Sequence, residues 1–111
     1  MPKYQYQVLT PHQACAMLRG SGAPKPVDVR GMAERGSGSI PGSLRIPLDE
    51  LEQTAPFLLP DRGTPVLVYC QSGARSWQGA QKLCEMGYSR VYELQGGFSG
   101  WQLCRAGLDR S

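Results

Sequence analysis

Short apolar runs along the chain are separated by longer stretches in which apolar residues recur every three or four positions. We interpret the runs at 4–9, 26–30, 65–69 and 90–94 as strands, because β-branched and aromatic residues dominate them and turn residues flank them. The run PVLVY at 65–69 contains no polar position, which is typical of a strand buried on both faces of a sheet.

The stretches between these runs carry helix signals. Thr10 can cap a helix that begins at Pro11, and Gly20 can end it. A second amphipathic helix is predicted over 75–87, and a short helix is expected to begin near Asp49. The residues expected on the buried faces of the two longer helices are Ala14, Met17 and Leu18 in the first and Trp77, Ala80, Leu83 and Cys84 in the second.

The alternation of strands and helices predicts an α/β layer fold whose central, mainly parallel sheet is flanked by helices on both faces. The length of 111 residues predicts one domain, residues 1–111. In such sheets, functional sites form at the carboxyl ends of the strands. The residues expected there are Asp28–Arg30, Cys70 and Gln95–Gly97.

Composition excludes several classes of protein. The net charge is only +3 and basic residues do not form a run, so nucleic acid is not an expected partner. The longest apolar stretch is far short of a membrane span, and the N-terminus lacks the apolar core of a signal peptide. We therefore expect a cytoplasmic protein that does not associate with membranes. The four cysteines lack C-x-x-C spacing, so we expect reduced thiols, no metal and no other cofactor.

Cys70 stands where the buried strand ends and a polar loop begins. Unpaired N–H groups of the loop and of the next helix, together with its dipole, favour an anion at this place. Gly73 allows a tight turn, Ser72 and Ser76 can donate hydrogen bonds, and Arg75 supplies a permanent positive charge. We therefore expect a thiolate nucleophile whose pKa lies below the ordinary value.

The other thiols and the only histidine are expected to be structural. Cys15, Cys84 and Cys104 fall on predicted helices among apolar neighbours, where cysteine acts as a small hydrophobe. His12 lies near a helix start and far along the chain from Cys70, which disfavours a Cys–His pair of the protease type. The two tryptophans, Trp77 and Trp101, are expected in the core.

Three motifs in order along the chain resemble those of a single-domain rhodanese, a member of a sulfurtransferase family. They are DVRGMAERGSGSIPGSLRIP at 28–47, VLVYCQSGARS at 66–76 and LQGGFSGW at 94–101. The chain departs from the family pattern at Ser39, where histidine is usual, and at Arg35, where an aromatic residue is common. Because the departures do not touch the Cys70 loop, the resemblance implies a rhodanese-like fold and its chemistry.

The resemblance also assigns roles to residues. It implies that Cys70 accepts sulfur as a persulfide, that Arg75 assists with charge, and that Asp28 and Arg30 brace the site, with Glu34 as the partner of Arg30. The loop that cradles the persulfide comprises Gln71, Ser72, Gly73, Ala74 and Arg75.

The implied reaction moves sulfur from a small anionic donor such as thiosulfate to a thiophilic acceptor such as cyanide or a thiol. A partner protein could instead load the persulfide and receive it for cofactor or tRNA thiolation. A non-catalytic interaction or sensing module on the same fold is a further alternative. A phosphatase is disfavoured, because related phosphatases carry C-x5-R whereas Cys70 and Arg75 are spaced as C-x4-R.

Overall fold

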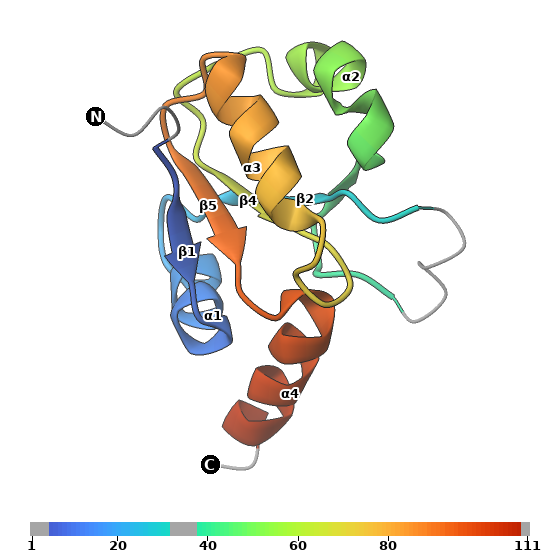
Figure 1. Ribbon diagram of the computed structural model, residues 1–111. Helices are drawn as coiled ribbons and strands as arrows, with labels where there is room; N and C mark the ends of the chain where they lie inside the picture. Colours follow the sequence, from blue (N-terminus) through green and yellow to red (C-terminus); the bar gives the residue numbers. More distant parts are fainter. Residues whose placement is uncertain (1–4, 32–37, 110–111) are drawn as a thin grey trace.

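The computed structural model describes residues 5–31 and 38–109 of the chain, with side chains described up to Cys104. The elements follow in the order β1 (Gln7–Leu9), α1 (Pro11–Arg19), β2 (Lys25–Asp28), β3 (Leu44–Arg45), η2 (Leu48–Glu50), α2 (Leu51–Leu58), β4 (Val66–Tyr69), α3 (Ser76–Glu85), β5 (Val91–Leu94) and α4 (Gly97–Asp109) (Figure 1).

The five strands form one parallel sheet in the order β1-β5-β4-β2-β3. The central strand, β4, is buried along its whole length, as its unbroken apolar run predicts. Val68 of β4 pairs with Val27 of β2 on one side and with Glu93 of β5 on the other. The prediction of an α/β fold with a mainly parallel sheet is confirmed, and all strands end at the same edge.

Helices cover both faces of the sheet (Figure 1). Side chains alternate along β4, so Val68 packs with α2 and α3 while Leu67 and Tyr69 pack with α1 and α4. The core under α2 and α3 also contains Leu51 and Leu83. Among the described residues, none of the helices is both long enough and apolar enough to cross a membrane.

The first helix begins as its sequence predicts. The Thr10 hydroxyl accepts the N–H of Gln13, and the Gln13 side chain accepts the N–H of Thr10, which forms a complete capping box. The buried face was only partly predicted, because Ala14 and Cys15 are buried whereas Met17 and Leu18 are half-buried.

The expected buried face of the second long helix is only partly confirmed, because Ala80 and Leu83 are buried as expected but Trp77 and Cys84 are not. Trp77, expected in the core, is 43% exposed, and Cys84 is half-buried. The buried residues of α3 are instead Ser76, Gly79, Ala80 and Leu83. Gly79 packs directly on the sheet, since a Cβ there would lie 3.0 Å from Val68 Cγ2. This close approach fixes the rotation of the helix and turns Trp77 outward, whereas Trp101 is 8% exposed and lies in the core as expected.

Candidate active site

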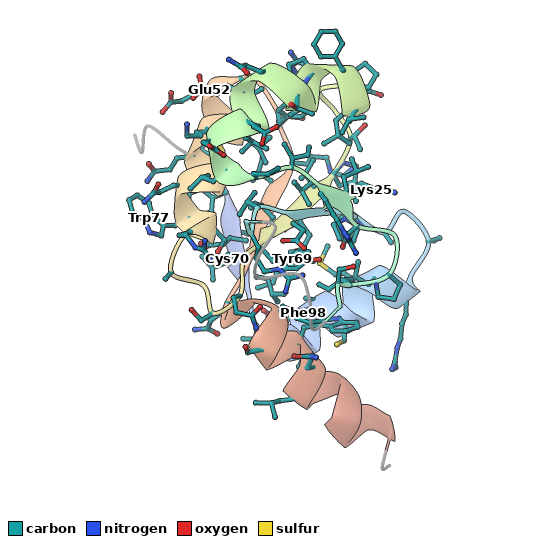
Figure 2. All side chains as sticks on the ribbon, turned by 90° about the vertical axis from the view of Figure 1, so that its right-hand side faces the viewer. Lys25, Glu52, Tyr69, Cys70, Trp77 and Phe98 are labelled. Atoms are coloured by element: carbon teal, nitrogen blue, oxygen red, sulfur yellow. The ribbon has the colours of Figure 1, made fainter. Side chains whose placement is uncertain are left out.

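Cys70 follows the last residue of β4 and is completely buried. Figure 2 shows it between the sheet and the loop that leads into α3. The N–H groups of Gly73 and Arg75 donate hydrogen bonds to its Sγ atom over 3.1 Å and 3.4 Å. The loop thus directs several hydrogen-bond donors at one thiol.

These donors decide the ionisation of the thiol. Burial raises the pKa of Cys70, but the N–H of Arg75, the hydroxyl and N–H of Ser76, and the N–H of Gly73 lower it by more. The pKa therefore lies below the ordinary value for cysteine, which favours a thiolate. By contrast, burial raises the pKa of Cys84.

The start of α4 holds the loop in place. The N–H of Phe98 donates to the carbonyl of Cys70 over 2.8 Å, and the N–H of Ser99 donates to the carbonyl of Gln71 over 3.0 Å. These are helix-terminal donors without partners inside the helix. Gly97 permits this approach, because its φ is +60° and a Cβ there would lie 2.5 Å from the carbonyl oxygen of Cys70.

A buried ion pair supports the loop from the other side. Arg30 and Asp28 are both fully buried, with Arg30 Nη2 2.7 Å from Asp28 Oδ2 and Arg30 Nε 2.9 Å from Oδ1. The same guanidinium donates to the carbonyl of Gly38 and lies 4.7 Å from the ring centroid of Phe98. Its Nη1 donates to Gln71 Oε1 over 2.9 Å, so the pair contacts the active-site loop directly.

The five loop residues play different parts in the structure. The side chain of Gln71 points inward, where it contacts Arg30 and donates to Ser99 Oγ over 3.0 Å. Ser72 and Ala74 are exposed, and the carbonyl of Ala74 accepts the indole N–H of Trp77 over 3.1 Å. Gly73 has a φ of +96°, as a tight turn requires.

Arg75 donates its backbone N–H to the sulfur, and this hydrogen bond lowers the pKa of Cys70. Its side chain lines a groove of about 350 Å³ together with Asp49, Gln78 and Lys82. The expected contribution of the guanidinium charge to the thiolate stays a prediction, and the backbone N–H is a further contribution that the structure adds.

Several other predicted features are placed by the structure. The Nδ1 atom of His12 lies 3.8 Å from the Sγ atom of Cys104, so the histidine neighbours this thiol and not Cys70. The four cysteines are free thiols. Within 5–31 and 38–109, His, Cys, Asp and Glu side chains do not gather into groups of three that could hold a metal. Glu34 and Arg35 lie outside the described residues.

Glu93 is a residue near the site that the sequence motifs did not indicate. It is 7% exposed, and its Oε2 accepts a hydrogen bond from Ser76 Oγ over 2.7 Å. The signal available in the sequence was an acidic residue within the otherwise apolar strand VYEL.

Several known proteins are similar to this chain in sequence and in fold. The thiosulfate sulfurtransferase GlpE of Shewanella oneidensis is 37% identical over 81 residues, which cover 72% of this chain and 77% of that protein. A rhodanese-like domain protein of Staphylococcus aureus superposes with a TM-score of 0.72 at 27% identity, covering 86% of this chain and 90% of that one. A protein of Rhodopseudomonas palustris, described as a possible tyrosine phosphatase, superposes with a TM-score of 0.76 at 32% identity over 92% and 82% of the two chains.

The sequence profile of the Rhodanese-like domain matches residues 10–104. This range includes every motif named above and the entire sheet except β1. The chain therefore belongs to the family of rhodanese-like domains.

Proposed function

We propose that this rhodanese-like domain is a sulfurtransferase of the thiosulfate type and that Cys70 is its nucleophile. The observation that carries the proposal is the buried sulfur of Cys70, which receives hydrogen bonds from loop N–H groups that lower its pKa. The names of relatives such as GlpE support thiosulfate as the donor.

The reaction proceeds in two nucleophilic steps. The thiolate of Cys70 attacks the outer sulfur of thiosulfate, a new S–S bond forms, and the bond to the sulfite sulfur breaks, so that sulfite leaves with the electron pair. Cys70 then carries a persulfide anion. In the second step an acceptor such as cyanide or a thiolate attacks the terminal sulfur, and the Cys70 thiolate leaves.

The loop contributes to both steps. Because Gly73 and Arg75 donate N–H groups to sulfur, the same donors can follow the negative charge when it moves to the persulfide. Cys70 is fully buried beneath the loop. This geometry favours small donors and acceptors. Relay of the persulfide to a partner protein uses the same chemistry and differs in the donor and acceptor.

Two other readings are less well supported. A non-catalytic module has no need of a thiol with a lowered pKa, which this site has. A phosphatase needs space for a tetrahedral anion, and the loop between Cys70 and Arg75 is one residue shorter than the phosphatase pattern. The reduced state of all four cysteines supports the cytoplasm as the compartment that we propose.

The direct test of activity is formation of thiocyanate from thiosulfate and cyanide. Wild-type protein should turn over, Cys70→Ser should not, and Cys84→Ser, which removes another thiol, should keep the wild-type rate. Turnover that survives Cys70→Ser would show that the nucleophile is another group. A panel with organic thiosulfonates and thiol acceptors then ranks the substrates.

A further inference from the structure

Glu93 is a buried carboxyl group behind the active-site loop that the reaction above does not use. It is the third residue of β5 and pairs with Val68 of β4 and Val8 of β1. Val91, two residues earlier, packs in the core beneath α3. Because side chains alternate along a strand, Glu93 faces the same side, toward the start of α3. There its Oε2 accepts the hydrogen bond from Ser76 Oγ over 2.7 Å.

Ser76 connects Glu93 to the reactive thiol. It is the first residue of α3, is fully buried, and directly follows Arg75, whose N–H donates to the Cys70 sulfur. Its hydroxyl and N–H lower the pKa of the Cys70 thiol. A serine hydroxyl carries only one proton to donate. The Ser76 hydroxyl lies 2.7 Å from Glu93 Oε2, and it also lowers the pKa of the Cys70 thiol. Two groups that form anions, a carboxyl and a thiol, therefore compete for a single hydroxyl donor.

We propose that Glu93 is a positioning residue that acts through Ser76 and determines whether the Ser76 hydroxyl donates to the Cys70 sulfur. When Glu93 is ionised, its carboxylate takes the Ser76 proton and leaves the sulfur with backbone donors alone. When Glu93 takes up a proton from solvent, its own O–H donates to Ser76 Oγ, and the Ser76 hydroxyl turns to the thiolate. This proposal rests on the proposed function only in taking Cys70 as the reacting thiol.

The surroundings of Glu93 favour such a switch. The titratable group that interacts with Glu93 is Tyr6, ahead of β1. The uncharged Ser76 of α3 lies between Glu93 and the thiol of Cys70, after β4. In the part of the chain that the structure describes, lysine and arginine do not form an ion pair with Glu93. Burial raises the pKa of Glu93 by more than the Ser76 hydrogen bond lowers it, whereas the pKa of Cys70 is lowered. The pKa values of the two groups are therefore shifted toward each other, and the shared Ser76 hydroxyl is the group through which their ionisation would be coupled.

Thiolate absorbance measured across a pH series tests the proposal without any sulfur donor. The signal of Cys70 is the difference between each protein and the same protein carrying Cys70→Ser. Wild type should titrate in two steps, because ionisation of Glu93 opposes ionisation of Cys70. Glu93→Gln cannot ionise, and its amide can donate to Ser76, so it should titrate in one step with a lower midpoint. A midpoint lower by one unit raises the thiolate fraction below the midpoint about tenfold.

Three further variants complete the design. Glu85→Gln is the matched control, because Glu85 is an exposed carboxylate on α3, the helix that begins at Ser76. It should leave the titration of Cys70 unchanged. Ser76→Ala should raise the midpoint of Cys70, because it removes the shared hydroxyl. In the Ser76→Ala background, Glu93→Gln should lose at least half of its effect on the midpoint, since the linking group is absent.

The proposal is overturned if wild type and Glu93→Gln show the same single-step titration, or if the effect of Glu93→Gln is undiminished without the Ser76 hydroxyl. Should Glu93→Gln fail to fold, a Ser76→Ala titration identical to wild type overturns it equally. Thiosulfate loading, measured on the same samples, separates the two claims. If thiosulfate loads sulfur but Glu93→Gln titrates like wild type, only the role of Glu93 is refuted. If the titrations differ as predicted but thiosulfate loads no sulfur, only the choice of thiosulfate as donor is refuted.

Discussion

Gly97→Ala should damage the active site more than its small size suggests. The new Cβ would lie 2.5 Å from the carbonyl oxygen of Cys70 and 2.7 Å and 2.8 Å from the carbonyl carbon and oxygen of Gln71. All three are backbone atoms, so no flexible side chain can move aside. The loop and the start of α4 must separate, which breaks the hydrogen bonds from Phe98 and Ser99 to these carbonyls.

The magnitude follows from two contributions. A non-glycine residue at a φ of +60° costs about 1–2 kcal/mol. Each of the two broken hydrogen bonds costs about 1 kcal/mol more. The free energy of unfolding should therefore fall by about 3–4 kcal/mol, a large part of the stability of a small domain.

Gly87→Ala provides the matched control. Gly87 has a φ of +96°, yet a Cβ there would meet no atom within 4 Å. It should therefore show the backbone cost alone, about 1–2 kcal/mol. Urea unfolding of both variants, with comparison of the slopes to verify two-state behaviour, gives the two values. Thiosulfate loading should also fall in Gly97→Ala and persist in Gly87→Ala. If both variants lose equal stability and both still load sulfur, the contact between α4 and the loop does not position Cys70.

Other predictions follow from the same geometry. Arg30→Lys keeps the charge but loses the forked contacts to Gln71 and Gly38, so urea unfolding should show a loss of about 3 kcal/mol and sulfur loading should slow. Arg75→Ala should leave the midpoint of the Cys70 thiolate titration nearly unchanged, since the backbone N–H remains; a clear rise would show that the guanidinium contributes as well. The rate of sulfur loading should hold as pH falls below the ordinary pKa of cysteine and drop only through the lowered pKa of Cys70, as stopped-flow measurements would show. Aryl phosphates should not be hydrolysed, and hydrolysis that Cys70→Ser abolishes would contradict the loop-length argument.

The fold and the place of Cys70 at the end of a central strand could be predicted because both depend on local patterns. The apolar run at 65–69 dictates a central strand, and the loop composition after Cys70 marks the end of that strand. The phase of α3 could not be predicted, because it depends on the close packing of Gly79 on Val68, a contact between separate elements.

The finer contacts in the site could not be predicted for the same kind of reason. Sequence identifies a cation at Arg75 but not which of its atoms reaches the sulfur, and the structure shows that the backbone N–H does. The role of Glu93 could not be predicted, because its hydrogen-bond partner, Ser76, lies on a different element of the chain. Tertiary contacts of single polar groups are decided by packing, which periodicity does not encode.

Transfer of one sulfur atom to Cys70 is the central claim of this account, and intact-mass spectrometry after incubation with thiosulfate tests it most directly. Wild-type protein should gain the mass of a single sulfur atom, the modified peptide should contain Cys70, and cyanide should restore the original mass. Cys70→Ser should gain nothing under the same conditions. Sulfur found on Cys15, Cys84 or Cys104, or equal loading of Cys70→Ser, would contradict the account.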